Sequence, residues 1–196
     1  MTHRLRSVIA IAMSMAIAVT IAMVWACSSD APSGGQGPVT TTVEPTDVID
    51  QELMIFLGQA KNFHHKAKVY TGEAKYDDAI AAVRQILSLP FPSNAPEADD
   101  VRLDARARLA KLLLARDSIE DAMQIVSEGL APRQRESFFV ANLYTVKGEI
   151  HEALVARYVA ANEPAKADAE RRAAIAAYDR SIQINEALQK KLMEGR

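Results

Sequence analysis

The sequence predicts an all-α fold, a stack of antiparallel helix hairpins that ends in a long C-terminal hairpin. From Asp47 onward, no stretch of the 196 residues alternates polar and apolar side chains as a strand does. Residues 101–196 contain 19 alanines, and alanine has the highest helix propensity. Beyond residue 47 the prolines are confined to three connections, at residues 90–96, 132 and 164. A domain of about 150 residues buries enough surface to fold without disulfides or metal.

Residues 1–26 are predicted to form a lipoprotein signal peptide. A basic hexapeptide precedes residues 7–26, which carry no charge and are apolar at 17 positions. As a helix, this run is about 30 Å long and matches the thickness of a bilayer. It ends in Val24-Trp25-Ala26-Cys27, and polarity returns at Ser28.

This ending resembles the bacterial lipobox, in which the cysteine thiol is acylated and the bond before it is cut. Trp25 departs from the pattern, which usually has a small residue there. The resemblance implies a lipid on Cys27 that holds the protein in the bilayer. Ser28, in place of an aspartate, implies the outer membrane with the domain facing the periplasm. The alternative is an inner-membrane anchor made of uncleaved residues 7–26.

Residues 27–45 are predicted to be a disordered tether that begins with the acylated Cys27. Gly, Ser, Pro and Thr dominate this stretch, and it has no apolar periodicity. Such a segment buries too little surface to offset the entropy cost of ordering it. Residues 46–196 are the predicted helical domain.

Six helices are expected in this domain, at residues 47–70, 76–88, 99–116, 119–130, 136–162 and 165–193. Asp47 is the expected N-cap of the first helix, and Asp99 or Asp100 opens the third. The last helix carries apolar residues that either cap the stack or contact another chain: Tyr178, Ile182, Ile184, Leu188 and Leu192.

The fifth helix allows two interpretations. One long helix over 136–162 keeps Val140, Tyr144, Ile150, Leu154 and Tyr158 on one broad stripe. The alternative breaks the helix at Gly148 and starts a new repeat that has Ala153 as its small residue. The continuous stripe favours the long helix.

Three segments share one pattern of residue sizes. Those that begin at Tyr76 and Ile119 both read apolar, acid, acid, Ala, apolar, two variable positions and apolar. A third copy begins at Ala174. Pairs that include small residues also recur on the preceding helices: Ala67 with Tyr70, Ala110 with Leu113, and Gly148 with His151.

This pattern resembles the tetratricopeptide repeat, in which small residues lie where two antiparallel helices touch. Helix axes 8–10 Å apart leave no room there for a branched side chain. The residues that the resemblance assigns to this packing are Ala79, Ala122, Gly129, Ala174 and Tyr178. The three alanines are 43 and 52 residues apart, whereas the family repeat is about 34 residues long. The excess is assigned to loop 89–98 and to a lengthened last hairpin.

No catalytic or metal-binding motif is complete. His151-Glu152 begins a zinc-protease HExxH motif, but Val155 occupies the position of the second histidine. His64 and His65 are adjacent, so on a helix they point about 100° apart. The single cysteine excludes a disulfide scaffold. We expect no enzyme activity, no metal and no cofactor. A net charge of −2 without a basic block argues against nucleic acid as a partner.

The resemblance implies that the first helix of each pair lines a concave face. The resemblance assigns residues to a partly basic partner groove suited to an acidic or C-terminal carboxylate peptide. They are Lys61, His64, Lys68, Arg108 and Lys111, together with Leu114, Asn142, Thr145, Glu149 and Glu152. We expect a non-enzymatic envelope lipoprotein that acts as a protein–protein interaction scaffold or adaptor for a cell-envelope assembly, secretion or motility complex. The alternative is a regulatory subunit of an envelope enzyme such as a cell-wall hydrolase.

Overall fold

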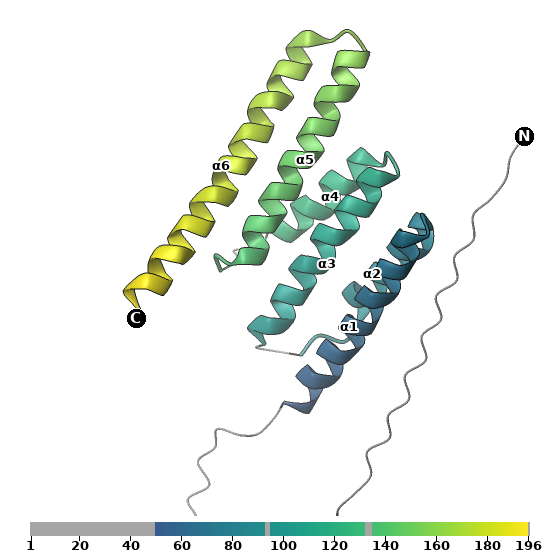
Figure 1. The fold of residues 1–196 in the computed structure, drawn as a ribbon, viewed down its shortest axis with the longest axis vertical. Coiled ribbons are helices and arrows are strands. Elements are labelled where there is room, and N and C mark those ends of the chain that lie inside the picture. The colour runs from purple at the N-terminus through teal and green to yellow at the C-terminus, as the bar shows by residue number, and fades with distance from the viewer. Residues whose placement is uncertain (1–49, 93–94, 132–134, 196) are drawn as a thin grey trace, which may run out of the picture. The chain divides into compact units, whose positions relative to one another are not determined.

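The computed structural model describes residues 50–92, 95–131 and 135–195. Within them it holds six helices and no strand, which confirms the all-α prediction (Figure 1). The helices are α1 (Gln51–Gly72), α2 (Tyr76–Ser88), α3 (Pro96–Ala115), α4 (Ile119–Leu130), α5 (Phe138–Ala160) and α6 (Pro164–Glu194). The predicted signal peptide, Cys27 and the tether lie outside the described residues.

Two helices begin at positions that differ from the prediction. Helix α1 starts after Asp50, whose carboxylate accepts the Leu53 N–H at 3.1 Å, so Asp50 is its N-cap in place of Asp47. Helix α3 starts at Pro96, three residues before Asp99. Proline suits the first turn of a helix because the N–H it lacks would have no partner there. The sequence places Pro96 in the preceding loop, because proline breaks a helix at positions beyond its first turn.

Helix α5 is continuous through Gly148, so the interpretation with a break there is wrong. Ser137 is its N-cap and accepts the Val140 N–H at 3.4 Å. The helix therefore begins two residues after the predicted start at Glu136.

The same kind of three-residue turn joins α1 to α2, α3 to α4, and α5 to α6. Its central residue has a left-handed backbone, with φ of 57° at Ala74, 60° at Asp117 and 56° at Asn162. The residue after it donates its N–H to a carbonyl five residues earlier, at 2.9 Å in all three turns. This is the Schellman motif, which closes the last carbonyls of a helix. The chain thus folds into three hairpins whose turns lie 43 and 45 residues apart.

These turns correct the predicted register of the third copy. Ala79 and Ala122 come five residues after their left-handed residue, and the equivalent residue in the last hairpin is Ala167, not Ala174. All three equivalents are fully buried. The pair on the preceding helix shifts by the same seven residues, from Gly148 with His151 to Val155 with Tyr158. Four residues after the buried alanine, the first two copies have Val83 and Val126, whereas the third has Arg171. The segment that begins at Ala174, two turns further along, therefore matches the residue pattern better than the true equivalent does.

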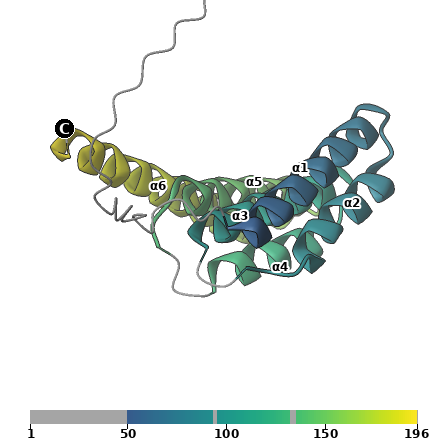
Figure 2. The same ribbon diagram turned by 90° about the horizontal axis from the view of Figure 1, so that it is seen from below.

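The first helices of the hairpins lie side by side, and α2 and α4 lie beneath them (Figure 2). Helix α3 contacts both helices of the first hairpin, and α5 contacts both helices of the second. Helix α6 contacts α5 alone among the described helices. The main core runs between the layers, and Ile86, Leu109, Leu143, Ile150 and Ile184 are among its largest fully buried side chains.

The apolar residues expected on the last helix to cap the stack or contact another chain do not all face the same side of α6. Ile184 is buried and Leu188 packs at the edge of the core, but Ile182 and Leu192 are 53% and 69% exposed. The buried side of α6 consists instead of Ala167, Ala174, Ala177, Ser181 and Ile184. Small residues fill most of this side because α6 lies close against α5.

Candidate functional site

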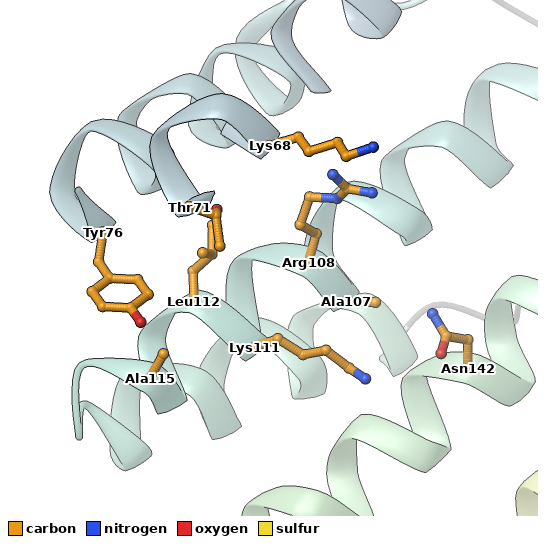
Figure 3. A pocket seen from close by; sticks show the side chains of 9 residues that line it. All are labelled: Lys68, Thr71, Tyr76, Ala107, Arg108, Lys111, Leu112, Ala115 and Asn142. Atoms are coloured by element: carbon orange, nitrogen blue, oxygen red, sulfur yellow. The ribbon is translucent and has the colours of Figure 1, made fainter. Parts of the chain in front are cut away.

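A pocket of about 510 Å³ opens on the side of the domain formed by the first helices. Lys68 comes from α1, Arg108 and Lys111 from α3, and Asn142 from α5 (Figure 3). Ala107, Leu112 and Ala115 supply the apolar part of its lining. We call this pocket the basic groove.

Local helix geometry explains why lysines from two helices meet there. Lys68 and Lys111 each lie six residues before the left-handed residue of their own turn, so they occupy equivalent positions in successive hairpins. Each follows a fully packed alanine, Ala67 or Ala110, which faces the core. The next residue along a helix points about 100° away, and here that direction leads to the groove.

The three cations of the groove differ in their ionic partners. Lys111 Nζ lies 2.9 Å from Glu149 Oε1, so its charge is largely balanced. Within the described residues, neither Lys68 nor Arg108 forms an ion pair. Figure 3 shows both side chains among those that line the pocket. The groove therefore presents uncompensated positive charge beside an apolar lining.

His64 lies next to the groove but does not line it. Its Nε2 is 3.4 Å from Asp104 Oδ2, and its Nδ1 is buried without a hydrogen-bond partner among the described residues. Burial lowers the pKa of His64, and the nearby Arg108 charge lowers it further, against the opposing effect of Asp104. We predicted His64 as a groove residue, and the structure makes it a largely uncharged neighbour of the groove at neutral pH.

Lys61 also falls outside the pocket. It is exposed on α1, two turns before Lys68 and on the same side of that helix. Of the predicted groove residues, the structure brings together Lys68, Arg108, Lys111 and Asn142 in this pocket.

Two polar residues of the groove were missed by the sequence analysis. Thr71 and Tyr76 lie on either side of the first turn, at the last residues of α1 and the first of α2. The Thr71 hydroxyl donates to the Ala67 carbonyl at 2.8 Å, which satisfies its donor within the helix. Thr71 lies three residues after Lys68, so helical periodicity could have found it, whereas Tyr76 lines the pocket from the second helix of the hairpin.

The residues predicted to pack the repeats are buried or half-buried. Ala79 and Ala122 have no exposed surface, and Ala174 is 5% exposed. Gly129 lies against the Leu143 and Arg106 side chains. The half-buried Tyr178 ring lies directly over Gly148 of α5.

Two of the three histidines in the described residues, His64 and His151, lie beside a carboxylate. His151 Nδ1 lies 2.6 Å from Glu170 Oε2 and links α5 to α6. In residues 50–92, 95–131 and 135–195, no group of three or more His, Cys, Asp or Glu side chains is arranged to hold a metal ion. None of the six described helices is long and apolar enough to cross a membrane.

No protein-family model, curated protein or solved structure matches the chain. The site must therefore be interpreted from its own geometry.

Proposed function

We propose that this protein is a non-enzymatic, lipid-anchored scaffold of the cell envelope that binds acidic segments of partner proteins in the basic groove. The domain has the architecture of a tetratricopeptide-like stack, and the outer membrane is its site of anchorage through Cys27. The partner belongs to an assembly, secretion or motility complex.

The repeated hairpins support a tetratricopeptide-like stack. Each hairpin closes with the same left-handed turn, and a fully buried alanine follows five residues later in all three. Each new first helix packs on both helices of the preceding hairpin. A stack of this kind presents its first helices as one continuous surface, which suits an extended peptide better than a small molecule.

The observation that carries the binding proposal is the uncompensated charge of Lys68 and Arg108. Both flank an open pocket with an apolar lining, and the guanidinium of Arg108 matches a carboxylate in two parallel hydrogen bonds. Asn142 adds an amide that donates and accepts. Carboxylates of a peptide are therefore the complementary ligand.

The binding test uses the full chain in detergent and a fluorescent ten-residue peptide of Asp and Glu with a free C-terminus. Wild-type protein is expected to bind it with an affinity that falls as salt is added. Lys68→Glu with Arg108→Glu should weaken binding by roughly tenfold or more. Arg84→Glu, an exposed change on α2, is the matched control and should leave affinity unchanged. Equal losses in both variants would contradict the groove as the site.

The anchor is tested separately in bacteria. Labelled palmitate should enter the wild-type chain and not Cys27→Ala, which should also leave the membrane fraction. Cleavage before Cys27 removes Trp25, the sole tryptophan, so the processed protein should show no tryptophan fluorescence. Unchanged labelling and fractionation of Cys27→Ala would refute the lipid anchor without affecting the groove.

A further inference from the structure

Three large apolar side chains of α6 lie in one exposed line. Ile175, Ile182 and Met193 are 60%, 53% and 70% exposed. Ile182 lies seven residues after Ile175, which is close to two whole turns of a helix. Met193 lies 18 residues after Ile175, which is five whole turns. The side chains therefore project from the same side of α6.

This line borders a pocket of about 390 Å³ between α5 and α6. Val155 and Glu152 line it from α5, and Ile175, Tyr178 and Arg171 line it from α6. In the two preceding hairpins, the next first helix packs against both members of the pair. No described helix packs in this way against both α5 and α6. The last hairpin thus has a groove of the kind that holds a helix in the rest of the domain.

Two charges on this side of α6, Arg171 and Glu186, are complementary to each other when the helix is reversed. Arg171 lies four residues before Ile175, and Glu186 lies four residues after Ile182. An antiparallel copy of α6, centred between Tyr178 and Asp179, places Ile175 against Ile182 and Arg171 against Glu186. A two-fold axis repeats each contact. A parallel copy would instead place Arg171 against Arg171 and Glu186 against Glu186.

We propose that the α5–α6 face binds a second copy of this chain, with the two α6 helices antiparallel. In that arrangement Ile182 of each copy enters the apolar pocket beside Ile175 of the other. Arg171 keeps its ion pair with Asp168 of its own helix and still has donors for Glu186, because a guanidinium carries five N–H groups. Glu186 has no ion pair among the described residues, so its carboxylate is available. The pairing of Arg171 with Glu186 and of Ile175 with Ile182 favours a second copy of this helix over a helix from an unrelated protein.

The test is the mass of the full chain in density-matched detergent, measured by sedimentation across protein concentrations. A dimer is expected for the wild type, and Ile182→Asp should give a monomer over the same range. Ile182 is exposed, so the variant should keep its helical circular dichroism. The matched control is Val69→Asp on α1, where the side chain is 59% exposed. It should leave the dimer intact.

Charge reversal tests the direction of the helices. Arg171→Glu and Glu186→Arg should each raise the dissociation constant by roughly tenfold, because like charges then meet twice in the dimer. The double variant restores opposite charges and should return the constant to about the wild-type value.

A wild-type monomer at all concentrations would overturn the proposal. So would a dimer that Ile182→Asp leaves as intact as Val69→Asp does, because association would then come from residues outside this face. Failure of the double variant to recover affinity would overturn the antiparallel arrangement. None of these results depends on the basic groove.

Discussion

Gly148 sets how closely α5 and α6 approach. A Cβ atom built at this position would lie 2.5–2.8 Å from three atoms of the Tyr178 ring. The half-buried ring packs over this glycine, so a side chain added there must displace the ring. Gly58 of α1 gives the contrast, because no atom lies within 4 Å of a Cβ built there.

Gly148→Ala is therefore expected to lower the free energy of unfolding by about 1–3 kcal/mol, the usual cost of overpacking. Gly58→Ala is the matched control. It should raise the free energy of unfolding by about 0.5–1 kcal/mol, because alanine restricts the unfolded chain and suits a helix. Urea unfolding of both variants measures the difference. A stabilising effect at Gly148 would show that Tyr178 is not packed as described.

At the level of single residues, Lys68, Arg108 and Lys111 are assigned to the groove by the family resemblance, and they line one pocket. Each stands one residue or one turn from a buried small or apolar position, so the 3.6-residue period is consistent with the assignment. His64 has the same helical position as a groove residue, but its neighbour Asp104 and its burial depend on the packing of α3 against α1. That packing cannot be derived from one helix at a time.

The repeating element of this domain is its turn as much as its helices. Ala74, Asp117 and Asn162 adopt left-handed backbones, where glycine is the usual residue. The expected break between the first two helices lies within residues 71–75, but Gly72 within it is still the last residue of α1. Because none of the three left-handed residues is a glycine, the sequence does not reveal where the turns lie. The third copy was therefore placed seven residues too far along the chain.

Ala74→Gly is expected to stabilise the protein by about 1 kcal/mol. An alanine in the left-handed region costs about 1–2 kcal/mol, and glycine recovers that cost but loses some of the gain to the entropy of the unfolded chain. Asn162→Gly should have a smaller effect, since asparagine tolerates this conformation better. Thermal unfolding of the two variants tests the order. A destabilised Ala74→Gly would mean that the turn is not left-handed in solution.

Successive hairpins are also linked by equivalent ion pairs. Asp77 and Glu120 each lie three residues after a left-handed residue, and each contacts an arginine of the next hairpin, Arg116 or Arg157. A hydrogen bond from its own backbone N–H, followed by one from the Arg157 guanidinium, lowers the pKa of Glu120. Both carboxylates are largely exposed, so these pairs align the hairpins more than they stabilise them.

For the whole domain, His64 makes stability depend on pH. Its pKa in the fold is below the ordinary value of 6.5, because of burial and the charge of Arg108. The unfolded chain then binds a proton that the folded chain does not, so the free energy of unfolding should fall as pH drops below about 6.5. Above that pH this contribution is constant.

Chemical unfolding at pH values between 7.5 and 5 measures this slope. His64→Gln should flatten it, because the variant cannot take up the proton. His65→Gln, at the exposed neighbouring position, is the control and should retain the wild-type slope. An unchanged slope in His64→Gln would assign the pH dependence to other groups.

The ion pair between Lys111 and Glu149 has a consequence for how an anion enters the basic groove. The protein supplies its own competitor there, because the Glu149 carboxylate already lies 2.9 Å from the lysine. An incoming acidic segment meets Lys68 and Arg108 first and gains Lys111 only by exchanging places with Glu149. Such an exchange changes no net charge around the lysine, so selectivity comes from the two cations that no internal acid neutralises.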